Sequence, residues 1–577
     1  MLKSKISSSL KAPLFFAAGA TLFLSMATAQ VVIAPSSPTV GSANPVTAEP
    51  PVPRPATKPC VVSLFKNEEF ADFNSKTFTY TPPASCPGPW AKVVFTADFT
   101  VTAGTQFDRT ASFYLGHANI YYGTTAEPSN TLSPSWHVER DVTDLSAIFK
   151  SSQTGEADLG NFVGVYNGTD YNGIIYANAT LKFYPAAANA PAAKVPDAVL
   201  PLPDAAGGAV ALNNTQSQLA ETFAFPTNVE RAYLDIITQS QSQDEFWYSC
   251  SPTNVAAKFN NCPNTGFREA EITIDGRPAG VAPVYPWIYT GGIDPFLWQP
   301  LPGVQTLDFV PYRVDLTPFA GVLSNGQQHT VAVSVFNAHS YFLAAGNILL
   351  YLDQGAGSVT GDIESDTLSA EPVPTVTENL KNPAPGTYTG TITVSSMRDF
   401  VITGYANTSH GRVETTVEQH LDFVNTQQMN ETPAVYIQNI VQSTEVHAKT
   451  TGNSRGTISE THRDFSYPLT MDYNFTQNAD GSYSQITSIQ QKYVKQTTRK
   501  VNGNPTYFSK VVNEVSPSDT LNFSPSFSFL GNTGQQSVAS YTFSDSLGAC
   551  YSRTLTAANG VLTHVDDSQN CGKPNGQ

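Results

Sequence analysis

Apolar and polar residues alternate along many short segments of the chain, which is the spacing of half-buried β-strands. Segments 92–101, 271–275, 330–336 and 387–394 alternate in this way or run through β-branched residues. Long amphipathic helical patterns are missing, and the best helix candidate is the short piece 144–150. Turn dipeptides separate the segments: Asp275-Gly276, Asn325-Gly326, Asp480-Gly481, Asn502-Gly503 and Asn559-Gly560. The pattern predicts an all-β protein.

A faint internal repeat runs through the first two thirds of the chain. The first copy reads Phe107-Asp108-Arg109, Arg140-Asp141-Val142-Thr143, Val165-Tyr166-Asn167, then Asn178 and Leu181. The second copy keeps the order and approximate spacing with Phe267-Arg268-Glu269, Arg313-Val314-Asp315-Leu316-Thr317, Val335-Phe336-Asn337, then Asn347 and Leu350. Chance similarity between β-rich segments is the alternative. We favour two copies of one β-sandwich unit, each of about 130 to 150 residues, the usual size of a jelly roll.

The predicted fold is therefore two packed jelly-roll β-sandwiches followed by a third strand-rich domain. The two rolls cover residues 60–187 and 205–354, and the C-terminal β domain covers residues 386–577. An Ala- and Pro-rich stretch, 185–204, links the rolls, and a polar stretch, 355–385, precedes the third domain. The third domain is expected to be a β-sandwich or a curled sheet.

The first residues have the pattern of a secretory signal peptide. Lys3, Lys5 and Lys11 flank an apolar run, 14–24, and small residues follow at 27–29. We assign residues 1–29 to the signal peptide and residues 30–59 to an extended Pro-rich linker. The run is too short for a membrane span, and no later stretch approaches eighteen apolar residues. A secreted or periplasmic protein without a membrane anchor is expected.

Charge and cysteine usage fit an exported protein. The formal charge is −16, and −19 once the three lysines are removed, which disfavours nucleic acid as a partner. The six cysteines form an even set, which favours disulfides in an exported chain. Fifteen pairings are possible, and we favour the three that are local in sequence: Cys60–Cys86, Cys250–Cys262 and Cys550–Cys571. Neither the cysteine nor the histidine spacing predicts a metal site, and no cofactor is expected.

Two adjacent carboxylates stand among large aromatic residues in the middle of the chain. Asp244-Glu245-Phe246-Trp247-Tyr248 is followed by Trp287-Ile288-Tyr289-Thr290-Gly291-Gly292 and by Leu297-Trp298-Gln299-Pro300. Aromatic faces stack on sugar rings, and carboxylates bind hydroxyls or move protons, so the composition suggests a carbohydrate-active site. The alternatives are an acidic loop tip and aromatic core packing.

These motifs resemble those of the plant-type, acid-active peptide-N-glycosidase A family. The first roll is similar to that family through Gln106-Phe107-Asp108-Arg109, Thr125-Ala126-Glu127-Pro128 and Trp136-His137-Val138-Glu139-Arg140-Asp141, and the C-terminal end more loosely. A more distant similarity exists to bacterial peptide-N-glycosidase F, a pair of packed jelly rolls in which an Asp-Arg pair opens a strand and the Asp is catalytic. Asp108-Arg109 matches that pair. The second acid of that roll has no clear counterpart here beyond Asp170.

The resemblance implies hydrolysis of the amide between asparagine and the first GlcNAc of an N-glycopeptide or N-glycoprotein. It implies that Asp108 positions water, that Arg109 or Arg268 orients that carboxylate or the carbonyl, and that Glu245 binds sugar or acts as the acid. Asp244, Trp247, Arg268, Tyr289 and Trp298 are the expected substrate-binding residues. Because Asp108 and Glu245 belong to different rolls, the site is expected at their interface.

Two other classes of function are also compatible with the sequence. One is a carbohydrate-binding or adhesin-like protein without turnover, and the other is a glycoside hydrolase that uses Asp244 or Glu245. Only an amidase converts Asn to Asp, whereas a glycosidase leaves a GlcNAc on Asn.

Overall fold

A computed structural model describes residues 38–203 and 208–567. Strands dominate it, and its two α-helices have four residues each, α1 (Thr253–Ala256) and α2 (Ala320–Leu323). The helix candidate 144–150 forms two 3-10 turns, η1 (Thr143–Leu145) and η2 (Ile148–Lys150). No helix in these described parts is long and apolar enough to cross a membrane. The predicted signal peptide lies outside the described residues.

The first roll consists of two four-stranded antiparallel sheets that enclose an aromatic core. One sheet has the order β1-β10-β3-β6 and the other β2-β7-β4-β5, the strand order of a jelly roll. Phe95, Phe113 and Tyr121 pack between the sheets because alternate residues of each strand face inward. The strands are β1 (Cys60–Phe70), β2 (Lys76–Tyr80), β3 (Trp90–Val101), β4 (Thr110–Leu115), β5 (Ala118–Thr124), β6 (Ser135–Asp141), β7 (Gln153–Asp158) and β10 (Ile175–Pro185), with a separate hairpin of β8 (Gly164–Tyr166) and β9 (Thr169–Tyr171).

The second roll repeats this topology. Its sheets have the orders β11-β19-β14-β17 and β13-β18-β15-β16, and β12 also pairs with β19. The strands are β11 (Ala198–Leu202), β12 (Val210–Leu212), β13 (Leu219–Ala224), β14 (Val229–Gln241), β15 (Glu269–Ile274), β16 (Arg277–Pro283), β17 (Tyr312–Asp315), β18 (Gln328–Val335) and β19 (Tyr341–Leu352). The prediction of an all-β protein with two jelly rolls is confirmed. Strand β11 lies within the stretch 185–204 that was predicted as a link.

The internal repeat corresponds to equivalent strands in three of its four parts. Phe107-Asp108-Arg109 precedes β4, and Phe267-Arg268 precedes β15, its counterpart in strand order. Arg140 and Arg313 lie in β6 and β17, which are also counterparts. Asn178 and Leu181 lie in β10, and Asn347 and Leu350 lie in its counterpart β19. The third part fails because Val335 ends β18, whereas 165–167 belongs to the β8–β9 hairpin that follows β7.

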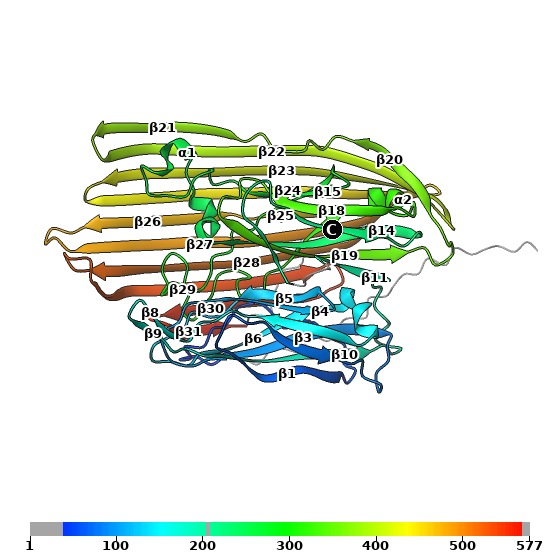
Figure 1. The fold of residues 1–577 in the computed structure, drawn as a ribbon, viewed down its shortest axis with the longest axis horizontal. Helices are drawn as coiled ribbons and strands as arrows, with labels where there is room; N and C mark the ends of the chain where they lie inside the picture. The colour runs from blue at the N-terminus through cyan, green and yellow to red at the C-terminus, as the bar shows by residue number, and fades with distance from the viewer. Residues whose placement is uncertain (1–37, 204–207, 568–577) are drawn as a thin grey trace, which may run out of the picture.

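The third region is one twelve-stranded antiparallel sheet with strands of up to 22 residues (Figure 1). It therefore matches the curled-sheet expectation and not the sandwich. The sheet starts before residue 386. Two strands from the polar stretch 355–385, β20 (Thr360–Asp366) and β21 (Thr375–Ala384), both pair with β22 (Thr387–Thr408). The strands are β20 (Thr360–Asp366), β21 (Thr375–Ala384), β22 (Thr387–Thr408), β23 (Gly411–Thr432), β24 (Val435–Ser454), β25 (Thr457–Ser466), β26 (Leu469–Gln477), β27 (Tyr483–Val501), β28 (Asn504–Phe523), β29 (Phe529–Asp545), β30 (Cys550–Ala558) and β31 (Val561–Asp566).

The second roll lies against one face of this long sheet, and the first roll lies beside both (Figure 1). One hydrophobic core runs continuously from the second roll into the sheet. Phe423 of β23, for example, packs against Trp247 and Phe267. The first roll has a core of its own. Leu307 and Leu349 of the second roll also belong to this core. The backbone of Asn119 exchanges two hydrogen bonds with the Asn347 side chain across the boundary.

The predicted Pro-rich linker has no regular secondary structure from residue 38 to residue 59, yet it is bound to all three units. Arg54 pairs with Glu139 of the first roll, and the Val46 amide donates to the Pro300 carbonyl at 3.0 Å. Asn513 of the sheet donates to Glu49 at 2.5 Å. This segment therefore acts as a strap across the units.

Candidate active site

Asp108 lies in the loop before β4 and crosses the boundary between the two rolls. Its Oδ2 accepts a hydrogen bond of 3.1 Å from the backbone amide of Gly291, in the long loop 284–311 of the second roll. Burial raises the pKa of Asp108, while the Gly291 amide and the Arg109 charge act in the opposite direction. A carboxylate held by a backbone donor and a guanidinium is suited to orient or deprotonate water.

Arg109 is fixed beside Asp108 by several local bonds. Its backbone amide donates to the Thr125 hydroxyl at 2.7 Å, and its Nη2 donates to Gln106 Oε1 at 3.0 Å. Its guanidinium carbon lies 5.2 Å from the centre of the Phe107 ring. The buried Nε has no hydrogen-bond partner among the described residues. Arg109 therefore keeps a free donor for an oxygen atom of a ligand.

Glu245 follows the 3-10 turn η3 (Ser242–Asp244) at the end of β14. Burial and, second, the negative charge of Asp108 raise the pKa of Glu245 to about 7. The two carboxyls predicted to be catalytic thus lie within each other's electrostatic field, although they come from different rolls. A half-buried carboxyl that holds its proton near neutrality is suited to donate it to a leaving group.

Glu127 is a third carboxyl at the same place. Burial and the Asp108 charge raise its pKa to about 8. A methyl group on Gly291 would meet Glu127 Oε2 at 2.6 Å and Asp108 Oδ1 at 3.0 Å, so both carboxyls abut this glycine.

Sequence reasoning noted the Glu127 segment without assigning it a role. The register of β4 and β5, in which Thr110 faces Thr124, places Glu127 opposite Phe107 by extension. The turn at Gly116-His117 indicates the hairpin, but the register shift between Phe113 and Tyr114 moves the pairing by one residue, and the sequence gives no sign of that shift.

Four of the expected substrate-binding residues lie in the core. Trp247 is 0% exposed and Trp298 is 2% exposed, so neither ring offers a face to a sugar. Asp244 and Arg268 form a fully buried ion pair of 2.8 Å. Asp244 Oδ2 also accepts the amides of His339 and Ser340, each at 2.8 Å. We therefore assign Asp244, Trp247 and Arg268 a positioning role for the loop that carries Glu245. Trp298 Nε1 donates to the Gly292 carbonyl at 2.9 Å and so positions the loop 284–311.

Tyr289 is buried between the two predicted catalytic carboxyls. Its hydroxyl donates to the Ser240 carbonyl, and burial, followed by the charges of Glu245 and Asp108, raises its pKa. The aromatic surface open to solvent comes from Phe107, which is 50% exposed and lies 5.3 Å from the Tyr171 ring. Phe246 is half-buried beside Gly292. These three rings, and not the tryptophans, can flank a sugar.

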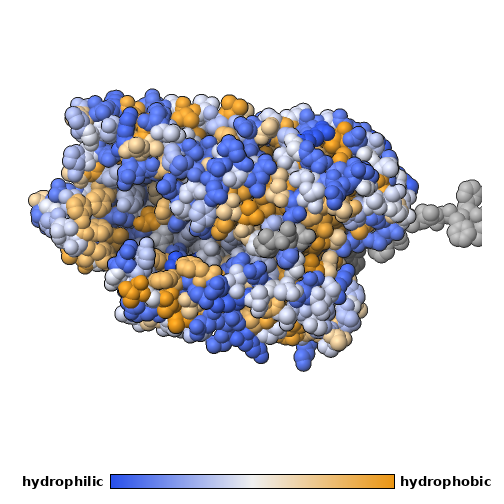
Figure 2. Space-filling model, in the orientation of Figure 1, coloured by the Kyte–Doolittle hydropathy of each residue, from blue (hydrophilic) through white to orange (hydrophobic). Residues whose placement is uncertain are grey.

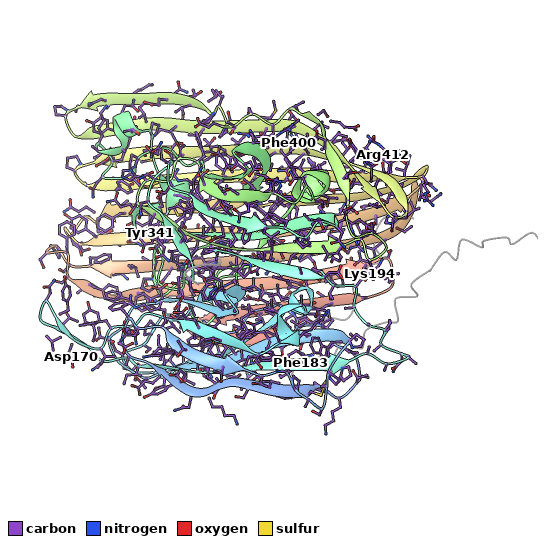
Figure 3. The ribbon with its side chains drawn as sticks, turned by 45° about the vertical axis from the view of Figure 1, so that its right-hand side comes forward. Asp170, Phe183, Lys194, Tyr341, Phe400 and Arg412 are labelled. Atoms are coloured by element: carbon purple, nitrogen blue, oxygen red, sulfur yellow. A yellow bond between two sulfur atoms is a disulfide. The ribbon has the colours of Figure 1, made fainter. Side chains whose placement is uncertain are left out.

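Asp170 lies on the β8–β9 hairpin at the edge of the first roll, where its side chain is exposed (Figure 3). The space-filling view shows a hollow on the front face between the first roll and the parts above it (Figure 2).

Two of the three predicted disulfides are present. Cys60 is bonded to Cys86, and Cys250 to Cys262. The second bond closes the segment after the Glu245 loop. The predicted partner of Cys550, Cys571, lies outside the described residues.

The site has acid–base groups and a cation, all supplied by the chain. Within residues 38–203 and 208–567, no group of three His, Cys, Asp or Glu residues is arranged to hold a metal ion. One carboxylate beside an arginine, together with two carboxyls that keep their protons to higher pH, is an arrangement for hydrolysis by general base and general acid.

Comparisons with known proteins agree with this chemistry. Residues 50–369 match the model of the family "Peptide N-acetyl-beta-D-glucosaminyl asparaginase amidase A", and residues 391–469 match that family's C-terminal domain. The chain is 26% identical to peptide-N4-(N-acetyl-beta-glucosaminyl)asparagine amidase A of Prunus dulcis, over 91% of this chain and 92% of that protein. Among solved structures, PNGF-II has 13% identity and a TM-score of 0.36, covering 51% of this chain and 65% of its own. PNGase F of Flavobacterium meningosepticum has 14% identity and a TM-score of 0.33, covering 51% and 96%.

Proposed function

Because the chain belongs to the peptide N-acetyl-beta-D-glucosaminyl asparaginase amidase A family, we propose that Asp108, Arg109, Glu127 and Glu245 carry out its amidase reaction. The protein is a peptide-N4-(N-acetyl-beta-glucosaminyl)asparagine amidase that releases N-glycans from glycopeptides. The observation that carries the residue assignment is the Asp108–Gly291 hydrogen bond, which brings the Asp108 carboxylate into the field of Glu245 across the two rolls.

Asp108 is the group that takes a proton from water. The Asp108 charge raises the pKa of both Glu127 and Glu245, so of the three carboxyls Asp108 is the one that ionises first. The water oxygen attacks the side-chain carbonyl carbon of asparagine, and the free Nε of Arg109 stabilises the developing oxyanion. Positioning and charge stabilisation of this kind need no covalent intermediate.

Glu245 supplies the proton for the leaving nitrogen. The carbon–nitrogen bond breaks, the glycosylamine leaves with the proton from Glu245, and asparagine becomes aspartate. Burial keeps Glu245 protonated in mildly acidic solution, because its pKa is raised to about 7. Glu127, with a pKa of about 8, remains neutral there and offers a hydroxyl donor beside Asp108.

The substrate is an N-glycopeptide or an N-glycoprotein, with its first GlcNAc against Phe107, Tyr171 and Phe246. Their exposed or half-buried faces support this placement. Export to the cell exterior or periplasm is supported by the signal-peptide pattern of residues 1–29. The acidic composition disfavours nucleic acid as a partner.

Asp108→Asn tests the assignment. We expect kcat to fall by about 10²–10⁴-fold, the usual contribution of a general base. Mass spectrometry of an incubated N-glycopeptide gives the readout, because an amidase leaves Asp in place of Asn and a glycosidase leaves GlcNAc on Asn.

Asp170→Asn is the matched control, since Asp170 is exposed on the β8–β9 hairpin. It should retain wild-type activity, and both variants should have the wild-type Tm. Full release of glycan by Asp108→Asn would overturn the role of this carboxylate. Binding of the glycopeptide without release by the wild type would favour the carbohydrate-binding alternative.

A further inference from the structure

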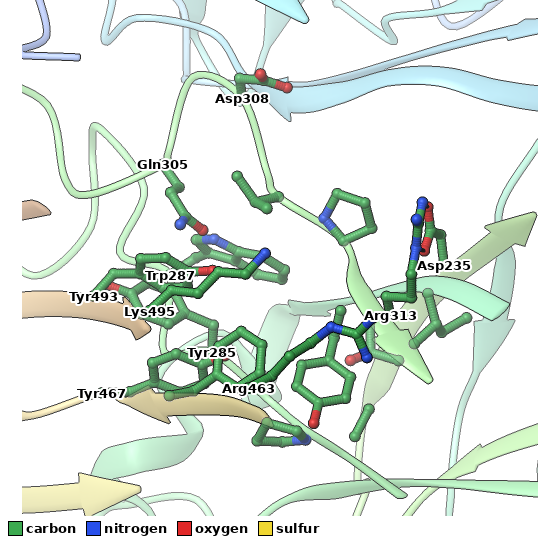
Figure 4. Close-up of a pocket in the computed structure, with 18 of the residues that line it drawn as sticks. Asp235, Tyr285, Trp287, Gln305, Asp308, Arg313, Arg463, Tyr467, Tyr493 and Lys495 are labelled. Carbon is green, nitrogen blue, oxygen red and sulfur yellow. Dashed lines mark hydrogen bonds and ion pairs between the residues drawn. The ribbon is translucent and has the colours of Figure 1, made fainter. Parts of the chain in front are cut away.

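A second cavity, of about 490 Å³, lies where the first roll, the second roll and the C-terminal sheet meet (Figure 4). Its size is typical of a pocket for a small organic ligand. It lies behind the proposed active site: Trp287 lines it, whereas Tyr289, two residues further along the same extended loop, is next to Glu245 and Asp108. The amidase chemistry proposed above does not use this space.

Three cations of the C-terminal sheet line the cavity from one face. Arg463 of β25 is paired in register with Thr497 of β27, and Lys495 and Arg499 flank Thr497 at the two next positions of the same face. Diagonal neighbours of this kind are about 7–8 Å apart, so the three charges repel one another. Figure 4 shows Lys495 beside Trp287, and Arg463 extending toward Arg313.

No carboxylate of the described residues forms an ion pair with these three cations. The four acids that line the cavity have other cations beside them: Asp235 pairs with Arg313 at 2.6 Å, Asp141 pairs with Lys92 at 2.6 Å, and Asp308 lies 3.7 Å from Arg140. Glu139 pairs with Arg54. Burial, and then the charges of Arg463 and Arg313, lower the pKa of Lys495 to about 8, while the Asp235 charge acts in the opposite direction.

Aromatic residues of the loop 284–311 and of the C-terminal sheet line the cavity beside the cations. The Tyr285 hydroxyl and the Trp287 Nε1 are buried, at 5% and 4% exposure of their residues, and neither has a hydrogen-bond partner within the described chain. Tyr467 and Tyr493 stack beside them, with ring centres 5.4 Å apart. Aromatic faces beside a group of cations favour a ligand that has both an apolar face and a negative charge.

We propose that this cavity binds an acidic saccharide, that is, a sugar that carries a carboxylate or a phosphate. The oxyanion is held by Arg463, Lys495 and Arg499, and the apolar face of the ring lies against the aromatic residues that line the cavity. Cations that face one another without a counter-ion gain most from such an anion.

The test is calorimetric titration of the Asp108→Asn protein, which keeps binding separate from turnover. N-acetylneuraminic acid and glucose 6-phosphate are the acidic probes, N-acetylglucosamine is the neutral probe, and inorganic phosphate is the ion alone. We expect an acidic sugar to bind at least about tenfold more tightly than both N-acetylglucosamine and inorganic phosphate, with weaker binding at high salt.

The double variant Arg463→Gln/Lys495→Gln should lose at least about tenfold in that affinity. The matched control, Lys66→Gln/Lys510→Gln, removes the same charge from exposed positions and should bind like the parent. Preference for the carboxylated sugar would point to the antenna of a substrate glycan, and preference for the phosphorylated one to a free sugar phosphate.

Three results would overturn the proposal. They are equal affinity in the parent and the double variant, no binding of either acidic sugar, and phosphate binding as tight as that of the sugars. The variant's Tm adds a further check. Because repulsion between the cations is removed, Tm should stay or rise, and a fall would mark these residues as structural supports instead.

Discussion

At the scale of the residue, Gly291 has a steric role as well as a hydrogen-bonding one. Its amide donates to Asp108, and its missing side chain leaves the space in which Asp108 and Glu127 approach each other. Neither feature depends on an unusual backbone angle. Gly291 thus connects the long loop of the second roll to two carboxyls of the first.

Gly291→Ala should damage the site without unfolding the protein. The added methyl would lie 2.6 Å from Glu127 Oε2, so the carboxyls must move apart. Displacement of a reacting group by about 1 Å costs on the order of 10²-fold in rate, and we expect a loss of kcat/KM of that size with an unchanged Tm. Gly357→Ala is the control, because nothing lies within 4 Å of its new methyl. Equal activity of both variants would contradict the role of Gly291.

Glu245 should set the alkaline limit of the reaction. Its pKa of about 7 means that the proton needed by the leaving nitrogen is lost as the pH rises through neutrality. A profile of kcat/KM against pH should therefore fall above about pH 7 in the wild type. In Glu245→Gln the residual rate should be about 10²–10⁴-fold lower and should lack that alkaline limb. If the alkaline limb of the profile persists in Glu245→Gln, another group is responsible for it, and Glu127 is the first candidate.

The sequence predicts the location of some site residues better than the solvent exposure of others, and the difference has a physical reason. The Asp108-Arg109 motif is local, and the structure places it beside Glu245, as expected from two packed rolls. The exposure of a tryptophan is decided by the unit that covers it. Trp247 is buried because Phe423, 176 positions away in the chain, packs against it from the C-terminal sheet. No local sequence pattern shows that a distant part of the chain covers Trp247.

At the scale of the element, the Glu245 loop depends on buried polar contacts. The Asp244–Arg268 pair fixes the turn before Glu245. Amide side chains of the sheet then bind the backbone that follows: Asn425 donates to the Tyr248 carbonyl at 2.8 Å and Gln438 to the Ser249 carbonyl at 2.8 Å. The long loop 284–311 is held likewise, because Gln491 donates to the Pro286 carbonyl at 2.7 Å and accepts from the Val304 amide at 2.8 Å. The sheet thus orders both loops that carry the site.

Arg268→Met should be strongly destabilising. It leaves Asp244 as a buried charge without its cation, and loss of one partner of a buried pair costs about 3–5 kcal/mol. Denaturant unfolding measures this cost. Lys492→Met is the control, because Lys492 and its partner Glu514 are 38% and 41% exposed and such pairs contribute no more than about 1 kcal/mol. Similar free energies of unfolding for the two variants would show that the Asp244 pair does not hold the loop.

At the scale of the whole molecule, the three predicted units are less independent than their sequence boundaries indicate. The second roll and the C-terminal sheet share one continuous hydrophobic core, and the strap formed by residues 38–59 touches all three units. Composition marked the strap and the stretch 355–385 as linkers because both are polar or rich in proline. Extended segments of this kind also serve as edge strands and surface straps, and only their tertiary contacts distinguish these roles.

The whole fold should be most stable in mildly acidic solution. Burial raises the pKa of Glu269 to about 8 and that of Asp294 and Asp308 to about 7, in addition to Glu127 and Glu245 at the site. Between the ordinary carboxyl pKa and these values the folded protein binds more protons than the unfolded chain, so its stability falls as the pH rises through that window. Surface carboxyls with a lowered pKa, such as Asp98 and Asp275, act in the opposite sense and set the acid limit.

Thermal unfolding between pH 4.5 and pH 8 tests this expectation, with Tm predicted to fall steadily above about pH 5. Asp308→Asn should make the slope shallower, because an amide of similar shape has no proton to lose and still sits within reach of Arg140. Asp170→Asn, at an exposed carboxyl, should leave the slope unchanged. A Tm that rises from pH 5 to pH 8 would mean that the buried carboxyls are ionised in the folded protein. Glu245 would then lack the proton that its role requires. The raised pKa of the buried carboxyls thus determines both the pH dependence of stability and the catalytic mechanism.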